Sequence, residues 1–133
     1  MFKVYIDGSC RGNGGPDSVG GIGVAIFQDD KLVGSLALRM FKPATNNEAE
    51  YYGLLRALTL VPKTAEVHIY SDSKLVVNQV NGKWKAKEAR LNKLKEKAQE
   101  LLKQFTDVSL KWIPRTKNSV ANQLAQDITD EKK

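Results

Sequence analysis

The sequence predicts an α/β fold: a five-stranded mixed sheet, made of a three-stranded antiparallel meander and two parallel strands, flanked by helices. Two observations support this prediction. Three strand-like apolar segments follow one another before residue 41, and helical and strand-like segments alternate after residue 45. Strands that follow helices are expected to lie parallel to the first strand through right-handed crossovers. The expected order is βββαβααβα, in one domain that spans residues 1–133.

The predicted meander occupies the first forty residues. Residues 2–6 and 19–27 have strand-like apolar patterns, and 32–40 forms a third strand after a turn at Gln28–Lys31. The glycines of the second strand indicate a bulge or a close approach of another backbone.

Helical periodicity begins at Thr45. Its side chain and Glu48, three residues later, match a capping box, and Pro62 ends the helix. The remaining elements, in chain order, are a strand over 66–71, helices over 73–81 and 88–105, a strand over 107–113 and a helix over 119–127. Trp112 is expected in the core, and residues 129–133 are expected to form a frayed tail.

The charge of the chain favours a polyanionic partner. Lys and Arg number 21 against 15 Asp and Glu, a formal net charge of +6, although a soluble protein can be basic without such a partner. Basic residues are concentrated between Lys83 and Lys97. A single cysteine, Cys10, excludes an internal disulfide and a cysteine-based zinc cluster, and it favours a cytoplasmic location. No apolar run approaches the ~18 residues of a membrane span, and the N-terminal residues form a strand pattern rather than a signal peptide.

Three acidic residues lie beside segments that should be buried. Asp7 and Asp72 follow strand-like runs, and Glu50 lies on the apolar stripe of the first helix, about 160° from Glu48. Because the carboxyl ends of parallel strands meet in such sheets, we expect the three carboxylates to converge there. Buried carboxylates are costly unless a cation neutralises them, and oxygen-only ligands suit Mg²⁺ or Mn²⁺ better than zinc.

Each acid also has a purely structural interpretation. Asp72 could be the N-cap of the following helix, Asp7 a turn residue and Glu50 the partner of a lysine. Together, on a basic chain, they favour a metal site for phosphodiester chemistry, where two ions ~4 Å apart can flank the scissile phosphate.

Four segments resemble the motif blocks of type 1 ribonuclease H, in the order and at the spacing of that family. They are YIDGSCRGNGGP, TNNEAEYYGLLRAL, IYSDSKLVVNQVNG and WIPRTKNSVANQLAQ. The resemblance implies a ribonuclease H-like fold and an endonuclease that cuts the RNA strand of RNA–DNA hybrids. It also implies a pair of Mg²⁺ ions, with Mn²⁺ as a substitute, and products with 3′-hydroxyl and 5′-phosphate ends.

The family's catalytic and metal-binding acids correspond to Asp7, Glu50 and Asp72, and its fourth acid corresponds to Asn122. The resemblance implies that Asp7 binds both ions, that Glu50 and Asp72 complete the site of the leaving-group ion, and that the fourth acid completes the site of the water-activating ion. Asn122 carries no charge, so we expect the water-activating ion to bind more weakly and hydrolysis to slow more than substrate binding. Asp127 lies about 140° round the helix and cannot replace it. Alternatively, three carboxylates suffice and Asn122 is only a polar helix residue.

The loop before the last helix lacks the histidine of many family members. It contains Arg115, which resembles a family branch with arginine in this loop, where the side chain could hold the scissile phosphate; the alternative is a solvated arginine. The single histidine, His68, is interpreted as structural because ~13 Å of strand separates it from Asp72.

Recognition of a hybrid requires contacts with ribose 2′-hydroxyl groups and phosphates. The loop after Asp7 contains glycines that allow such an approach, and in the resembling family this loop and the TNN element contact riboses near the cut. A basic segment after Gly82 resembles a shortened form of the region that some members use to hold the DNA strand. The substrate-binding residues expected on these grounds are Gly8, Ser9, Cys10, Arg11, Asn13, Thr45, Asn46, Asn47, Lys83, Trp84, Lys85 and Arg115. For Cys10, a small loop residue without contact is an equal alternative.

Three functional interpretations follow. The first is a ribonuclease H, weakened by Asn122. The second is a non-catalytic domain that binds RNA–DNA hybrids, and the third is a related nuclease, such as the ribonuclease H part of a reverse transcriptase or an enzyme that also accepts double-stranded RNA. A monomer without an obligate protein partner is expected, because the sequence shows no spare apolar patch.

Overall fold

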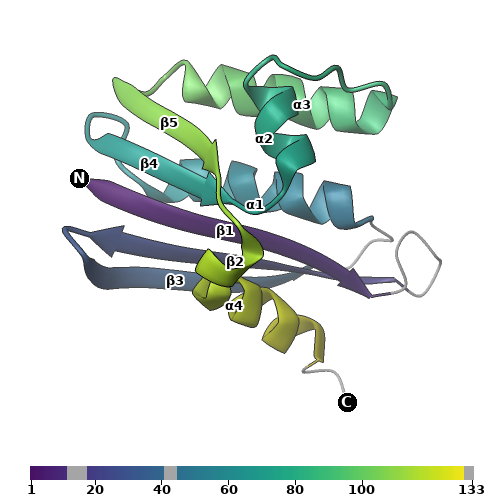
Figure 1. Ribbon diagram of the computed structural model, residues 1–133, viewed down its shortest axis with the longest axis horizontal. Coiled ribbons are helices and arrows are strands. Elements are labelled where there is room, and N and C mark those ends of the chain that lie inside the picture. The colour runs from purple at the N-terminus through teal and green to yellow at the C-terminus, as the bar shows by residue number, and fades with distance from the viewer. Residues whose placement is uncertain (12–17, 41–44, 131–133) are drawn as a thin grey trace.

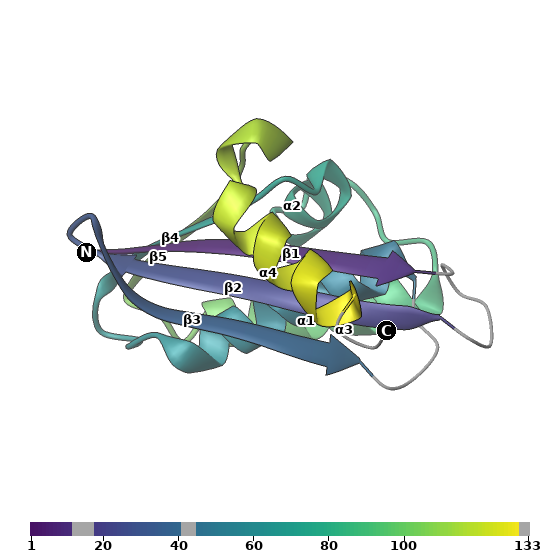
Figure 2. The same ribbon diagram turned by 90° about the horizontal axis from the view of Figure 1, so that it is seen from below.

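In a computed structural model of the chain, a five-stranded sheet carries helices on both faces (Figures 1 and 2). The structure describes residues 1–11, 18–40 and 45–130, without the side chains of residues 129 and 130. In chain order the elements are β1 (Phe2–Arg11), β2 (Val19–Gln28), β3 (Lys31–Met40), α1 (Asn46–Leu60), β4 (Glu66–Ser71), α2 (Lys74–Val80), α3 (Ala89–Leu102), β5 (Asp107–Trp112), the 3₁₀ turn η1 (Arg115–Lys117) and α4 (Ser119–Asp130). The predicted order is confirmed.

The strands lie in the order β3-β2-β1-β4-β5. β1, β2 and β3 pair antiparallel, whereas β4 is parallel to both β1 and β5. This is the mixed sheet that the sequence predicted. It places the carboxyl ends of β1 and β4 side by side near the centre of the sheet, where sheets of this kind collect ligands.

The first strand is longer than predicted. A strand over 2–6 was expected, but β1 continues to Arg11 and pairs with β2 along its whole length. Its parallel pairing with β4 ends earlier, at Ile6 and Ser71. Asp7 therefore lies inside a strand, one residue beyond the parallel pairing. The polar residues after it have a loop-like composition, but their backbone groups find partners in the glycine-rich half of β2.

The hydrophobic core lies mainly between the sheet and α1, with α2 and α3 on the same side (Figure 1). Its central side chains are at most 1% exposed and come from three elements, β1, α1 and β4: Val4, Ile6, Leu54, Leu58, Val67 and Ile69. α4 lies across the other face of the sheet, over β1 and β2 (Figure 2). Burial of the two faces thus fixes the position of both helices that flank the carboxyl end of β1.

Two glycines allow helices to approach the sheet closely. A Cβ atom at Gly8 would lie 2.2 Å from the backbone carbonyl carbon of Ala49 in α1, and one at Gly23 would lie 2.2 Å from the carbonyl oxygen of Ala121 in α4. Any larger residue would push the helix away. Gly23 thus confirms the close backbone approach that the glycines of the second strand indicated.

Most predicted boundaries hold within a few residues. The capping box of Thr45 and Glu48 is present at the start of α1. α3 ends at Leu102 rather than at residue 105, and α4 continues to Asp130 rather than stopping at residue 127. None of the helices in the described ranges is long and apolar enough to cross a membrane.

The prediction that Trp112 belongs to the core is wrong. The residue ends β5, an edge strand, so its side chain has protein on one side only and is 42% exposed. Its indole nitrogen donates a hydrogen bond to the carbonyl oxygen of Asp72 at 3.1 Å, and Nζ of Lys74 lies 4.8 Å from the centre of the ring.

Candidate metal centre

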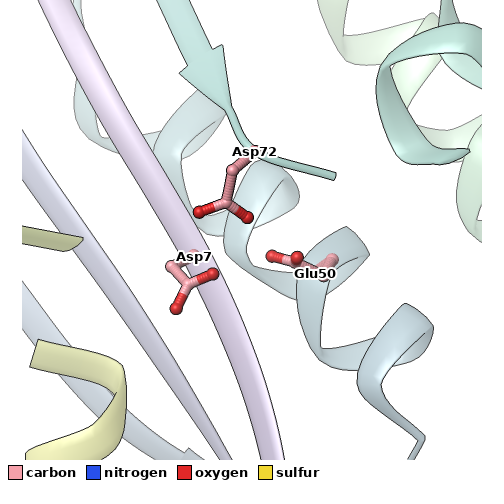
Figure 3. A group of neighbouring side chains, drawn as sticks. All are labelled: Asp7, Glu50 and Asp72. Carbon is pink, nitrogen blue, oxygen red and sulfur yellow. The ribbon is translucent and has the colours of Figure 1, made fainter. Parts of the chain in front are cut away.

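Three carboxylates converge where the parallel pairing of β1 and β4 ends (Figure 3). Asp7 comes from β1, Asp72 directly follows β4, and Glu50 comes from the N-terminal half of α1. One oxygen from each residue lies within 4.8 Å of the other two. The convergence that the sequence predicted is confirmed.

The close approach of β1 to α1 positions Glu50. The amide of Gly8 donates a hydrogen bond of 2.7 Å to Glu50 Oε1. Glu48 faces elsewhere: it completes the capping box with Thr45, and its Oε1 lies 3.6 Å from Arg90 Nη1. The helical phase therefore separates a structural glutamate from the glutamate of the acidic cluster, as predicted.

Asp72 is held by a residue of the loop before α4. Nδ2 of Asn118 donates to Asp72 Oδ2 at 3.0 Å and to the carbonyl oxygen of Ile6 at 2.8 Å. The interpretation of Asp72 as a helix N-cap does not hold, because Ser73 caps α2 by accepting a hydrogen bond of 3.2 Å from the amide of Val76. The carboxylate of Asp72 is thus available to the cluster.

Asp7 is a buried acid whose oxygens find no donor. It is 1% exposed, and neither carboxylate oxygen has a hydrogen-bond partner within the described residues. Burial, and then the nearby charge of Asp72, raise the pKa of Asp7 from 3.8 to about 7, although the guanidinium of Arg115 acts in the opposite direction. Burial, and then the charges of Asp7 and Asp72, also raise the pKa of Glu50 well above its ordinary value. Three negative charges are unfavourable at this place without a cation.

Buried oxygen atoms of Asp7 and of two asparagines, one before α4 and one in it, lack donors. Within the part of the chain that the structure describes, they include both carboxylate oxygens of Asp7, Oδ1 of Asn118 and Oδ1 of Asn122. All of these atoms are acceptors, and a divalent cation with its waters satisfies such atoms. Carboxylate and amide oxygens without sulfur form a ligand set that fits Mg²⁺ or Mn²⁺.

Asn122 lies in α4, one turn after Asn118, and is 8% exposed. Its Nδ2 donates a hydrogen bond of 3.3 Å to the carbonyl oxygen of Arg115. Asp127 is exposed and accepts a hydrogen bond of 2.7 Å from Gln123, so it lies elsewhere on the helix, as its helical phase predicted. The role of Asn122 as a metal ligand stays a prediction.

Arg115 begins η1 and is exposed. Its guanidinium is close enough to Asp7 to lower the pKa of that acid, which leaves a positive charge beside the cluster. A contact with phosphate stays a prediction. The ring nitrogens of His68 lie 2.9 Å from Ser109 Oγ and 2.7 Å from Glu66 Oε2, in agreement with a structural role.

The residues that follow Asp7 differ in their burial and in the contacts that they make within the protein. Gly8 is buried, and its amide already binds the acidic cluster. Ser9 donates a long hydrogen bond, 3.5 Å, to a carbonyl oxygen of α4. Cys10 is half-buried and Arg11 is exposed at the end of β1. Asn13 lies outside the described residues.

The TNN element lies at the start of α1. Thr45 is its N-cap, Asn46 is exposed and Asn47 is half-buried. The first turn of the same helix therefore presents these residues beside Glu50, where a bound substrate strand could reach both. Their contacts with ribose and phosphate stay predictions.

The basic loop at Lys83, Trp84 and Lys85 is exposed but attached to the core. The hydroxyl of Tyr51 donates to Gln79 Oε1 at 2.6 Å, and Nε2 of Gln79 donates to the carbonyl oxygen of Lys85 at 3.4 Å. Tyr51 follows Glu50 in α1. These bonds therefore connect the basic loop to the helix that carries Glu50, which corresponds to the family's catalytic glutamate.

The sequence interpretation missed two residues, Asn118 and Gln79. The spacing of Asn118 was a usable signal, since it precedes the last helix and lies four residues before Asn122, on the same helical face. Gln79 gave no such signal, because its two hydrogen-bond partners lie in other segments of the chain.

Comparison with known proteins places the chain in a family. The family model described as "Reverse transcriptase-like" matches residues 6–128. A Mycobacterium tuberculosis relative named as a bifunctional protein is 41% identical over 133 residues, which cover 97% of this chain and 36% of that protein. The chain thus spans about a third of the length of the first relatives it matches. Ribonuclease H of Clostridium botulinum is 31% identical over 143 residues, which cover 96% of this chain and 95% of the relative.

Solved structures agree with the sequence matches. RNase H1 from the halophilic archaeon Halobacterium salinarum superimposes with a TM-score of 0.90 at 32% identity, over 98% of each chain. LC11-RNase H1, solved in complex with an RNA/DNA hybrid, superimposes with a TM-score of 0.86 at 31% identity, also over 98% of each chain. Since sequence and structure agree over nearly the whole chain, this protein belongs to the type 1 ribonuclease H family.

Proposed function

We propose that this chain is an endonuclease that hydrolyses the RNA strand of RNA–DNA hybrids and leaves 3′-hydroxyl and 5′-phosphate ends. The observation that carries the proposal is the cluster of buried Asp7 with half-buried Glu50 and Asp72, in which both oxygens of Asp7 lack a donor within the described residues. Such a cluster destabilises the fold unless it binds a cation. This cost favours a functional explanation of the cluster over a structural one.

The proposed cofactor is Mg²⁺, two ions per site, with Mn²⁺ as a substitute. Asp7, Glu50 and Asp72 would hold the ions, and Asn122 would offer a neutral oxygen in place of a fourth carboxylate. When bound, such ions supply activation of the attacking water and stabilisation of the leaving oxygen. The protein's own part is positional: the amide of Gly8 holds Glu50, Asn118 holds Asp72, and Arg115 brings a positive charge to the site.

The proposed substrate follows from the family and from an exposed basic loop of this chain. LC11-RNase H1 was solved with an RNA/DNA hybrid. In this chain the exposed loop at Lys83, Trp84 and Lys85 offers two cations and an aromatic ring, which suit a phosphate backbone. A monomeric state and a cytoplasmic location stay predictions.

Asn122 supports a second candidate, a hybrid-binding domain with little or no turnover. An amide in place of the fourth carboxylate removes one negative charge, so the cluster attracts fewer or weaker-bound cations. Substrate binding does not depend on this charge and should persist.

Cleavage of a labelled RNA–DNA hybrid in Mg²⁺ and in Mn²⁺ tests the proposal. The wild-type chain is expected to cut, and Asn122→Asp is expected to cut roughly 10–100-fold faster, by comparison with the loss of that size that follows mutation of a residue that supports a metal ligand. Asp7→Asn should abolish cleavage in either background while hybrid binding persists. Double-stranded RNA, run in parallel, tests the related-nuclease alternative.

The contrary outcomes are distinct. If wild type and Asn122→Asp both bind the hybrid and neither cuts it, the chain is a binding domain and not an enzyme. If Asp7→Asn still cuts, the metal assignment is wrong.

A further inference from the structure

Asn118 joins the acidic cluster to the loop before α4. It lies between η1 and α4 and is 1% exposed. Its side-chain amide donates to the carbonyl oxygen of Ile6 at 2.8 Å and to Asp72 Oδ2 at 3.0 Å. Because both partners are pure acceptors, the NH₂ end of the amide must face them, and both of its hydrogens are in use.

Asp72 needs such a contact more than its neighbours do. Asp7 is enclosed by protein, and Glu50 is held by the amide of Gly8. Asp72 is only half-buried, and the carboxylates of the other two acids repel it, so its side chain can turn toward solvent when the cluster holds no cation. A neutral donor on Oδ2 opposes this rotation without adding a positive charge that would compete with the metal.

The same amide also fixes the spacing of the two aspartates. Ile6 directly precedes Asp7, and it forms the last pair of the parallel ladder with Ser71, which directly precedes Asp72. By bonding both the Ile6 carbonyl and the Asp72 carboxylate, Asn118 bridges the two strands at the point where their ladder ends. This is the point at which backbone pairing no longer holds the strands together.

Backbone contacts extend the connection to α4. The amide of Asn118 donates to the carbonyl oxygen of Arg115 at 3.0 Å, and its carbonyl oxygen accepts from the amide of Asn122 at 3.0 Å. One residue therefore sets the position of Asp72, of the Arg115 turn and of the helix that carries Asn122.

We propose that Asn118 is a positioning residue for Asp72, and that it thereby sets the affinity of the acidic cluster for divalent cations. The inference rests on the metal site of the proposed function. A residue that only stabilises the fold would not act on metal binding through a particular ligand. The proposed role of Asn118 predicts an effect on metal affinity that depends on the carboxylate of Asp72.

Binding of Mn²⁺ alone, measured by electron paramagnetic resonance or calorimetry, tests this inference without any need for cleavage. Asn118→Ala is expected to weaken Mn²⁺ binding about 10–100-fold, the range for residues that orient metal ligands. Asn118→Ser, which keeps one donor, should fall between Ala and wild type. In an Asp72→Ala background, measured at higher Mn²⁺ concentrations, Asn118→Ala should cost little further affinity.

Asn81→Ala is the matched control. Nδ2 of Asn81 also donates to a strand carbonyl, that of Leu110 at 3.0 Å, but does not touch the acidic cluster. The control should leave Mn²⁺ affinity unchanged. Melting temperatures in EDTA report the loss of stability of each variant separately from its metal affinity.

Two results would overturn the inference: unchanged Mn²⁺ affinity in folded Asn118→Ala, or an equal loss of affinity in the Asp72→Ala background. Either would leave Asn118 as a residue that only stabilises the fold. If Asn118→Ala does not fold, the Mn²⁺ affinity of Asn118→Ser decides. If the wild-type chain binds no Mn²⁺, the proposed metal site itself is wrong. If the wild-type chain binds Mn²⁺ and Asn118→Ala binds it equally well, only the role of Asn118 is wrong.

Discussion

Asp7 illustrates how a candidate metal ligand can oppose folding while no cation is bound. Its carboxylate is buried beside Asp72 and Glu50, and no donor in the described residues satisfies its oxygens. Asn122 differs: its amide is also buried, but Nδ2 is bonded to the Arg115 carbonyl, so only its oxygen remains for a cation. If Asn122 occupies the position of the fourth acid, as the resemblance implies, the amide lowers the electrostatic cost of the site together with its attraction for metal.

The pKa of Asp7 predicts how stability depends on pH. Burial and the charge of Asp72 raise this pKa from 3.8 to about 7, so between these values the native state binds a proton that the unfolded state releases. In EDTA, the free energy of unfolding should therefore fall as pH rises from about 4 to about 7. The change should be on the order of a few kcal/mol, since one pKa unit corresponds to about 1.4 kcal/mol. Urea denaturation across this pH range measures it.

Two comparisons check the cause of this pH dependence. Asp7→Asn should flatten the decline, although the raised pKa of Glu50 acts in the same direction and leaves part of it. Saturating Mg²⁺ should also reduce the decline, because the cation favours the deprotonated acids. A decline of equal size in Asp7→Asn would show that other groups cause it.

At the scale of elements, the contact between β1 and α1 decides where Glu50 lies. The two backbones approach so closely that the amide of Gly8 reaches Glu50 Oε1 at 2.7 Å. The cap formed by Thr45 fixes where α1 begins, and thus its rotational phase, while the core leucines fix which face meets the sheet. The glutamate is therefore positioned by packing and backbone contacts, with no flexible loop involved.

Gly8→Ala should disrupt this contact. Its Cβ would lie 2.2 Å from the Ala49 backbone, and overpacking of this kind typically costs about 1–3 kcal/mol. The variant should unfold at lower urea concentration and cut hybrid more slowly, since α1 must move and carry Glu50 with it. Gly34→Ala is the control, because its Cβ would meet nothing closer than 3.8 Å. This variant should change neither the urea concentration of unfolding nor the rate of cleavage. Wild-type cleavage by Gly8→Ala would contradict this account of the site.

The basic loop between α2 and α3 is a second element with a testable role. The chain has two tryptophans, Trp84 in this loop and Trp112 at the end of β5, with exposed fractions of 49% and 42%. In a Trp112→Phe variant, emission comes from Trp84 alone. If the loop contacts the substrate, hybrid should change this emission in a saturable way, measured in an Asp7→Asn background to prevent cleavage. Saturated binding by anisotropy without any change in Trp84 emission would exclude the loop from the interface.

For the whole molecule, the basic α2–α3 loop and the acidic cluster come from different segments of the chain. The chain carries a net charge of +6, yet its acidic cluster lies at the carboxyl ends of two central strands. Cations of the α2–α3 loop lie in a different segment, joined to α1 through Tyr51 and Gln79. This separation allows the chain to attract a nucleic acid without neutralising its own metal ligands.

Hybrid binding should therefore depend steeply on salt. The slope of log K against log salt concentration should become shallower by about 1 for each phosphate contact that is removed, as expected for Lys83→Ala or Lys85→Ala. Lys31→Ala, at the β2–β3 turn, is the control and should leave the slope unchanged, because this turn follows Gln28, which pairs with Phe2 at the start of β1, whereas Asp7 pairs with Gly23 further along the ladder. Equal slopes in all three variants would exclude the loop lysines from phosphate contacts.

The order of elements, the capping of α1 and the choice of Glu50 over Glu48 could all be predicted from the sequence. These features depend on periodicity and on residues a few positions apart, so they can be predicted from local pattern. The extension of β1 to Arg11, the exposure of Trp112 and the bond from Asn118 to Asp72 became evident only in the packed fold. The bond from Asn118 to Ile6 joins residues 112 positions apart, and such contacts exist only once the sheet and α4 have packed. The sequence thus predicted which acids meet, while packing decided what holds them and which of their oxygens remain for a cation.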